Sequence, residues 1–256
     1  MYRNYIFDFY GTLADIRTDE DDLRLWQKMS EIYGAMGADY NPGELQQAFR
    51  RLELEEKERL GGEDGEPNLT KVFAMLYHEK KAFCDASQAR MTAITFRALS
   101  RRFLRAYDGV EELLGELRNR GRRVYLLSNA QADFTRPEIE MLGLTRFFDG
   151  IFLSSEQGCK KPSPLFFRKL LERYRLEPSE SIMVGNDGAA DIAGAQGVGL
   201  DTLYIHTAIS PEESGRSRAT YSVMDGDFRK AADILLERKP ASAFRKGKCP
   251  PKRPEA

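Results

Sequence analysis

Short apolar runs alternate with helical patterns over much of this 256-residue chain, and this alternation restricts its fold more than any other feature. Between the runs, apolar residues recur at helical spacing over 110–120, 164–174 and 189–197. Strands that alternate with helices predict a parallel sheet whose two faces are covered. The sequence therefore predicts an α/β protein. The predicted strands are Tyr5–Phe9, Val124–Ser128, Ile151–Ser154, Ile182–Gly185 and Thr202–Ile205.

The segment from about Ala14 to Phe103 departs from this alternation, because it offers long helical patterns and no convincing strand. We expect a core domain of residues 1–13 and 105–237 and an inserted, all-helical cap domain of residues 14–104, whose two connections could act as hinges. Residues 238–256 are rich in Lys, Arg and Pro and are predicted to form a disordered basic tail. The predicted cap helices are Asp21–Met36, Pro42–Leu60, Leu69–Lys81 and Met91–Leu104.

Composition excludes several classes of protein. The formal charge of −1 gives no global attraction to nucleic acid or to an anionic membrane. No apolar run approaches the about 20 residues that span a bilayer, and the N-terminus lacks the pattern of a signal peptide. Cys84, Cys159 and Cys249 are odd in number and lack metal-like spacing, so we expect reduced thiols. A cytoplasmic protein that acts on a small molecule, without nucleic acid or membrane as a partner, is therefore predicted.

The first two of four polar clusters follow predicted strands. Asp8 ends the first strand and is followed by a turn at Gly11, which places its carboxylate where open α/β sheets bind ligands. An Asp with an ordinary pKa near 3.9 is ionised at neutral pH, so it can act as a nucleophile without a base. Ser128 and Asn129 follow the second strand, where a hydroxyl and backbone N–H groups could hold an anionic oxygen.

The other two clusters supply a cation and a pair of acids. Lys160 and Lys161 precede a helix that begins with proline, and a Lys there can reduce repulsion between a carboxylate and an anionic substrate. Asp187 and Asp191 are four residues apart at a helix start, so they share one face at the end that favours negative charge.

This ordered set of clusters resembles the haloacid dehalogenase superfamily of hydrolases, whose four motifs lie at strand ends in this order. The resemblance covers residues 4–13 and 105–206, and it implies a Rossmann-like parallel core with a helical cap inserted after the first motif. It also implies that Asp8 is the nucleophile, that Ser128 binds the transferring group and that Lys161 neutralises charge around Asp8. Lys161 is favoured over Lys160 because it directly precedes Pro162, as in the family's pattern. The other residues expected to bind the substrate are Tyr10, Thr12 and Asn129, and Thr12 is also expected to support the loop around Asp8.

The resemblance further implies a Mg²⁺ ion. Its expected ligands are Asp8, the backbone carbonyl of Tyr10, Asp187 and Asp191, which suit the oxygen-rich coordination of this cation. Without a cation, two carboxylates beside Asp8 would repel it strongly in a partly buried site. Phosphoryl transfer through an aspartyl-phosphate would follow.

Tyr10 departs from the phosphatase pattern. Most phosphatases of this superfamily carry Asp two residues after the nucleophile, where it protonates the leaving group and activates water. Tyr is a poor base at neutral pH, and the loss of a positioned acid typically costs a factor of about 10² to 10⁴. The string Asp-x-Tyr-Gly-Thr-Leu instead looks like the metal-independent 2-haloacid dehalogenases, where halide leaves without a proton. Those enzymes use a cap Arg near the halide; Arg50 and Arg51 are candidates, although solvated side chains are favoured in so charged a helix.

The leading prediction is therefore a Mg²⁺-dependent phosphatase of this superfamily that acts on a small phosphorylated metabolite through Asp8. One alternative is a metal-independent 2-haloacid dehalogenase that uses Asp8 to displace halide. The other is a catalytically weakened binding protein on the same scaffold. The first cluster favours the dehalogenase, whereas the paired acids Asp187 and Asp191 favour the phosphatase.

Overall fold

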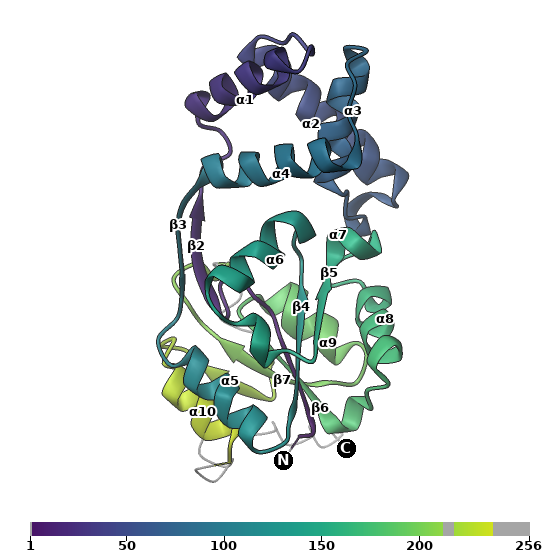
Figure 1. The fold of residues 1–256 in the computed structure, drawn as a ribbon. Helices are drawn as coiled ribbons and strands as arrows, with labels where there is room; N and C mark the ends of the chain where they lie inside the picture. Colours follow the sequence, from purple (N-terminus) through teal and green to yellow (C-terminus); the bar gives the residue numbers. More distant parts are fainter. Residues whose placement is uncertain (1, 212–217, 238–256) are drawn as a thin grey trace, which may run out of the picture.

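The structure is a computed structural model that describes residues 2–211 and 218–237. Its centre is a six-stranded parallel sheet with the strand order β5-β4-β1-β6-β7-β8 (Figure 1). A separate pair of antiparallel strands, β2 and β3, rises from the core to the helical segment above it. The strands are β1 Asn4–Phe7, β2 Ala14–Thr18, β3 Arg101–Ala106, β4 Arg123–Ser128, β5 Gly150–Leu153, β6 Ser181–Gly185, β7 Asp201–Ile205 and β8 Tyr221–Val223.

Helices pack on both faces of the large sheet because its central strands are apolar on both sides. All four residues of β1 are buried, with Tyr5 and Phe7 in the core cluster on one face and Ile6 in the cluster on the other. Helices α5 and α10 contribute to the first cluster, and α8 to the second. The core helices are α5 Val110–Asn119, α6 Ala132–Met141, α7 Ser154–Gln157, α8 Pro164–Tyr174, α9 Gly194–Gln196 and α10 Phe228–Leu235, with a π-helical turn at Gly188–Ala193 and 3-10 turns at Thr145–Phe147 and Pro178–Glu180.

The cap is helical, as predicted. Each cap helix begins at an Asp or Asn whose side chain accepts a hydrogen bond from the first turn, at Asp22, Asn41, Asn68 and Asp85. The interior of the cap is aromatic and includes Trp26, Phe49, Phe73 and Phe96. The cap helices are α1 Leu23–Ala35, α2 Pro42–Arg59, α3 Leu69–Glu79 and α4 Ala86–Ser100, with a 3-10 turn at Gly62–Asp64.

The fold class is confirmed. Three predictions of individual helices and strands are corrected by the structure. The ends of the inserted segment, predicted to lack strands, pair as β2 and β3. The helix predicted over Met91–Leu104 therefore ends at Ser100, and the chain continues as β3. The helix predicted over 189–197 is a π-helical turn followed by the short α9. The predicted tail of residues 238–256 lies outside the described residues.

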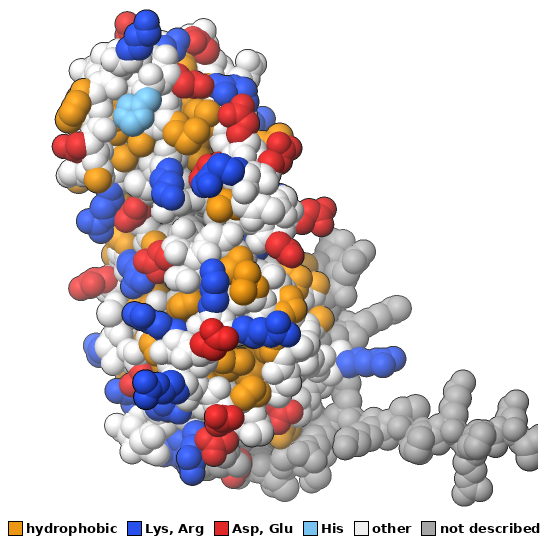
Figure 2. Space-filling model, turned by 90° about the vertical axis from the view of Figure 1, so that its right-hand side faces the viewer, with side chains coloured by type: hydrophobic (Ala, Val, Ile, Leu, Met, Phe, Trp, Pro, Cys, Tyr) orange, Lys and Arg blue, Asp and Glu red, His pale blue; other side chains and the backbone are white. Residues whose placement is uncertain are grey.

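The surface carries charges of both signs. On the face shown in Figure 2, basic and acidic side chains are interspersed and hydrophobic side chains occur in small groups among them. Among the described residues, no helix is both long and apolar enough to cross a bilayer.

Candidate active site

Asp8 lies at the carboxyl end of the central strand. β1 ends at Phe7 and is flanked by β4 and β6, so the next residue emerges in the middle of this edge of the sheet. The amide of Asp8 still donates to the carbonyl of Val184 (3.0 Å), which fixes the backbone, and the residue is only 7% exposed. The sheet therefore positions the predicted nucleophile where ligands reach an open α/β fold.

The carboxylate of Asp8 accepts hydrogen bonds from three residues that sequence analysis singled out. Its Oδ1 accepts from Ser128 Oγ (2.9 Å) and from Lys161 Nζ (2.7 Å). Its Oδ2 accepts from Thr12 Oγ1 at 3.3 Å. Thr12 is fully buried behind the carboxylate, so it supports the loop. The structure thus brings the first three motifs together around one carboxylate.

Lys161 is held more tightly than a surface lysine. Its ammonium donates to Asp8, to Asp191 Oδ1 (2.6 Å) and to the carbonyl of Leu127 (2.9 Å), which uses all three N–H groups. Burial opposes the charge of Lys161, but the carboxylates of Asp191 and Asp8 raise its pKa above the ordinary value. Lys161 therefore stays cationic beside Asp8.

The neighbours of Lys161 explain why it, and not Lys160, reaches the site. Asn129 Nδ2 donates to the carbonyl of Lys161 (2.9 Å), and Asn129 Oδ1 accepts from the amide of Lys161 (2.8 Å). This pair of bonds ties the fourth strand's end to the lysine loop. Lys160 turns the other way, and its Nζ lies 3.7 Å from Glu66 at the base of the cap.

The two acids of the last motif have different surroundings. Asp191 is buried, and its oxygens accept from Lys161 and from the amide of Asp187 (2.9 Å). Burial raises the pKa of Asp191 to about 7; Lys161 opposes this shift and Asp8 adds to it. Asp187 is partly exposed, and its Oδ1 caps the π-helical turn by accepting from the amides of Ala189 and Ala190.

Two glycines allow these side chains to approach the backbone. A Cβ on Gly185 would lie 2.2 Å from Asp191 Oδ2, so only glycine leaves room for the buried carboxylate beneath β6. Gly11 has φ of +81° and a Cβ there would lie 2.3 Å from Asn186 Nδ2. Both close approaches are needed for the loops to meet around Asp8.

The donor set can be tested for a metal ion. Among the described residues, no three His, Cys, Asp or Glu side chains converge as a metal-binding group. Asp8 and Asp187 nevertheless line the same cavity as Tyr10, and Asp187 Oδ2 has no hydrogen-bond partner within the described part of the chain. Two carboxylates and a backbone carbonyl, completed by water, fit Mg²⁺. Asp191 is instead engaged by Lys161, so its role as a metal ligand stays a prediction.

The hydroxyl of Tyr10 points towards α6 and not towards Asp8. Its hydroxyl donates to Glu138 and lies 3.0 Å from Thr135 Oγ1, both on α6. Burial, followed by the negative charge of Glu138, raises the pKa of Tyr10 above its ordinary value. A phenol with a raised pKa is a weaker acid and is even less ionised at neutral pH, so we do not expect Tyr10 to replace the missing carboxylic acid.

Sequence analysis missed the arginine that reaches this region. Arg97 of α4 donates to Glu138 Oε1 (2.8 Å) and lies 5.4 Å above the ring of Tyr10. No signal in the sequence separated Arg97 from the other charged residues of the cap. The candidates Arg50 and Arg51 are exposed and pair with acids on the cap surface, Asp21 for the first and Glu55 and Glu79 for the second.

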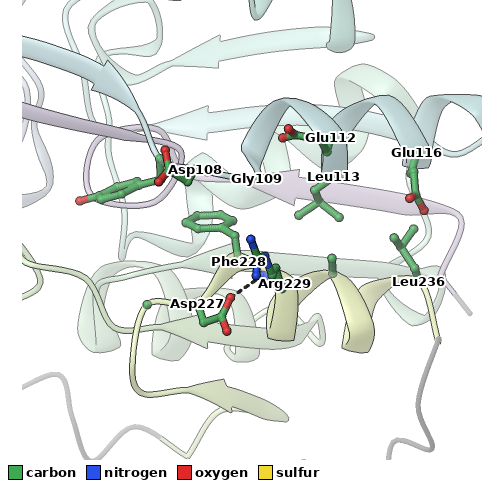
Figure 3. A pocket seen from close by; sticks show the side chains of 12 residues that line it. Asp108, Gly109, Glu112, Leu113, Glu116, Asp227, Phe228, Arg229 and Leu236 are labelled. Carbon is green, nitrogen blue, oxygen red and sulfur yellow. Dashed lines mark hydrogen bonds between the residues drawn. The ribbon is translucent and has the colours of Figure 1, made fainter.

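The site opens into a cavity of about 200 Å³ whose lining includes residues of all four motifs. A larger cavity, of about 950 Å³, lies between α5 and α10 (Figure 3). Leu113 and Phe228 point into it, and Asp227 at its edge accepts from the amide of Arg229, which caps α10. None of the predicted site residues lines this larger cavity, so the candidate site is the smaller one. Its lining residues are Asp8, Tyr10, Ser128, Asn129, Lys161, Asn186, Asp187, Ala190, Asp191, Ile209 and Pro211.

Comparison with known proteins places this geometry in a family. The model of the haloacid dehalogenase-like hydrolases matches residues 2–199. The chain belongs to this family of hydrolases, as the four motifs predict.

Curated relatives include phosphatases. The chain is 32% identical over 142 residues to a phosphoserine phosphatase of Thermus thermophilus, a match that covers 56% of this chain and 55% of the relative. It is 39% identical over 127 residues to a ribulose-1,5-bisphosphate 5-phosphatase of Halopiger xanaduensis, covering 50% and 51%. The chain thus spans about half the length of these relatives.

Solved structures share the fold at low sequence identity. A 2-haloacid dehalogenase from Pseudomonas syringae superimposes with a TM-score of 0.66 at 18% identity, covering 93% of this chain and all of the other. The hydrolase YfnB of Bacillus subtilis, bound to magnesium, superimposes with a TM-score of 0.54 at 19% identity, covering 92% and 99%. The fold is therefore shared with a 2-haloacid dehalogenase and with a magnesium-bound hydrolase.

Proposed function

We propose that this protein is a Mg²⁺-dependent phosphatase that hydrolyses a small phosphorylated metabolite through an aspartyl-phosphate at Asp8. The observation that carries the proposal is the carboxylate of Asp8, which is held by Ser128 and Lys161 at a cavity that Asp187 also lines. The phosphatases among the curated relatives support the same reaction class.

The residues present suit a two-step displacement. Asp8 attacks phosphorus, the bond from phosphorus to the leaving oxygen breaks, and its electron pair leaves with that oxygen. Water then attacks phosphorus and releases inorganic phosphate, which restores the carboxylate. Lys161 lowers the repulsion between Asp8 and the anionic substrate, and the hydroxyl of Ser128 can bond to a phosphoryl oxygen.

Asp8, Asp187 and the carbonyl of Tyr10 would hold Mg²⁺, with Asp191 nearby as the counter-charge of Lys161. When bound, the ion would supply positive charge that draws phosphoryl oxygens to the site. Asn129 and Tyr10 line the cavity and are proposed to contact the substrate, whereas Thr12 holds the loop from behind.

Metal removal tests this proposal. With p-nitrophenyl phosphate as substrate, we expect turnover in Mg²⁺ and a fall of at least about tenfold in EDTA, because the charge of Asp8 and Asp187 would then face the substrate with only Lys161 to offset it. Release of p-nitrophenolate measures the rate, and restored Mg²⁺ should restore it. Turnover that is equally fast in EDTA would contradict the metal requirement.

One observation favours a second function, metal-independent dehalogenation. Lys161 bridges Asp8 and Asp191, so part of the repulsion that would call for a metal is already offset by the chain itself. The hydroxyl of Tyr10 is bound to Glu138 and is not available to protonate a leaving group. A leaving halide would not need such a proton.

The dehalogenase prediction is tested by halide release. For this second function, 2-chloropropionate in EDTA should yield chloride at a rate that Asp8→Asn abolishes. A panel of 2-haloacids that gives no halide with and without Mg²⁺ would eliminate it. The same preparation assayed with p-nitrophenyl phosphate serves as the control for active protein.

A further inference from the structure

Helix α6 of the core carries the surface on which the cap rests. Figure 1 shows α4 lying above α6. Phe134 of α6 packs into the aromatic interior of the cap, with its ring 6.3 Å from that of Phe96. Asp133 accepts from Thr70 (2.7 Å) and from Arg90 (2.9 Å), and Glu138 accepts from Arg97. The cap is therefore attached to one helix at several points.

Two ion pairs along this seam differ in burial. The pair between Arg90 and Asp133 is open to solvent, with side-chain exposures of 59% and 26%. The pair between Arg97 and Glu138 is enclosed, with exposures of 11% and 1%. A buried carboxylate must keep a cationic partner, whereas an exposed one can exchange it for water. The attachment of the cap to α6 thus depends far more on Glu138 than on Asp133.

Glu138 also contacts the loop that follows Asp8, through Tyr10. Besides Arg97, it accepts from Arg101 Nη1 (3.0 Å) and from the hydroxyl of Tyr10. Both cations belong to the cap side, at the end of α4 and the start of β3, while Tyr10 follows Asp8 by two residues. If the cap lifts, Glu138 loses both cations and keeps, among the described residues, the hydroxyl of Tyr10 as its partner.

We propose that Arg97 and Glu138 are positioning residues that couple the seating of the cap to the loop of Asp8. With the cap seated, Arg97 fixes Glu138, Glu138 fixes Tyr10, and Tyr10 holds the turn from Asp8 to Ala14. The importance of that loop rests on the proposed function, but the coupling itself does not require turnover. By linkage, a change at either end must be felt equally at the other.

Amide hydrogen exchange can follow both ends of this connection in the full-length protein. The turn has its own protected amides, since Leu13 and Ala14 donate to the carbonyl of Phe9 (2.8 and 2.9 Å) and Gly11 donates to that of Ala14 (2.8 Å). Helix α4 supplies the amides at the cap end. Peptides from β6 and β7, away from the seam, report global stability.

The central variant is Arg97→Gln, with Arg90→Gln as its matched control on the same helix. We expect Arg97→Gln to speed exchange in α4 and also in the turn, by about fivefold or more. Arg90→Gln should speed exchange in α4 alone, because its partner Asp133 makes no hydrogen bond with Tyr10 within the described part of the chain. Arg97→Lys keeps the charge and should recover part of the protection. Faster exchange in α4 with a turn at the wild-type rate would overturn the proposal.

A second variant decides the case if Arg97→Gln loosens the whole fold, as faster exchange in β6 and β7 would reveal. Tyr10→Phe removes one hydroxyl and keeps the ring under Arg97. Coupling requires that this change in the loop of Asp8 speeds exchange in α4, although the ring contact with Arg97 is kept. Wild-type exchange in α4 would sink the proposal, and neither result depends on whether the protein proves to be a phosphatase.

Discussion

Asp8→Asn is expected to lower kcat by at least about 10⁴-fold, because the amide cannot form the covalent intermediate on which both proposed reactions depend. Lys161 and Ser128 would remain in place, since the lysine keeps its bonds to Asp191 and Leu127. The loss should therefore fall on kcat and leave the melting temperature near that of the wild type. Steady-state kinetics with p-nitrophenyl phosphate and a thermal melt measure the two quantities.

A surface carboxylate provides the control for this variant. Asp225 is exposed, pairs with Lys230 and does not line the cavity of Asp8, so Asp225→Asn should keep full activity. Acid quenching of the wild-type reaction should trap a phosphorylated chain that Asp8→Asn does not form. An Asp8→Asn variant that retains even about a hundredth of the rate would exclude Asp8 as the nucleophile. Absence of turnover in the wild type with every substrate tested would favour the binding protein.

The second large effect concerns the leaving group. The hydroxyl of Tyr10 is bound to Glu138, and the proposed function assigns Asp187 to the metal and Asp191 to Lys161, so no residue of the described cavity is assigned as an acid for the leaving oxygen. We expect aryl phosphates with acidic phenols to turn over far faster than alkyl phosphates, whose leaving oxygen needs a proton. Tyr10→Asp should raise the rate on alkyl phosphates by about 10² to 10⁴ and barely alter that on p-nitrophenyl phosphate.

Tyr10→Asn is the matched control, because Asn has the shape of Asp and loses the same contacts with α6 but cannot donate a proton as an acid. Only the Asp variant should flatten the dependence of the rate on leaving-group pKa. If both variants behave alike, position 10 does not govern proton transfer. An equally flat dependence in the wild type would show that another group supplies the proton.

The sequence was sufficient to bring Asp8, Ser128 and Asp187 together, because each lies at the end of a strand that is apolar on both faces. Once the strands β1, β4 and β6 are predicted, parallel pairing brings Asp8, Ser128 and Asp187 to one edge regardless of small errors at the strand ends. The first strand was expected to run to Phe9 and ends at Phe7, which leaves this argument unaffected.

Pairing between distant segments was not visible in the sequence. Strand β3 is rich in arginine and follows a helix directly, so local pattern favoured continuing that helix to Leu104. Its strand state depends on β2, whose partner residues lie more than 80 positions away, as with Arg17 and Phe103. Strand propensity reflects such context more than the residues themselves.

The surroundings of Tyr10 could not be predicted for a related reason. Helix α6 was not predicted, and it contains Pro137 inside the helix, which a sequence pattern treats as a break. Glu138 on that helix decides where the phenol points. Sequence alone therefore indicated what Tyr10 lacks as an acid, and only the fold indicated what it binds instead.

Ala14 and Ala106 are directly paired in the ribbon of β2 and β3, so the chain leaves the core and returns to it at neighbouring positions. Opposed residues of an antiparallel pair lie about 5 Å apart at Cα, a gap that a tight turn can close. The strands of the large sheet all lie outside this excursion. The whole helical cap is thus inserted at one point of the core, so it could be exchanged for another domain without changing the strand order of the large sheet.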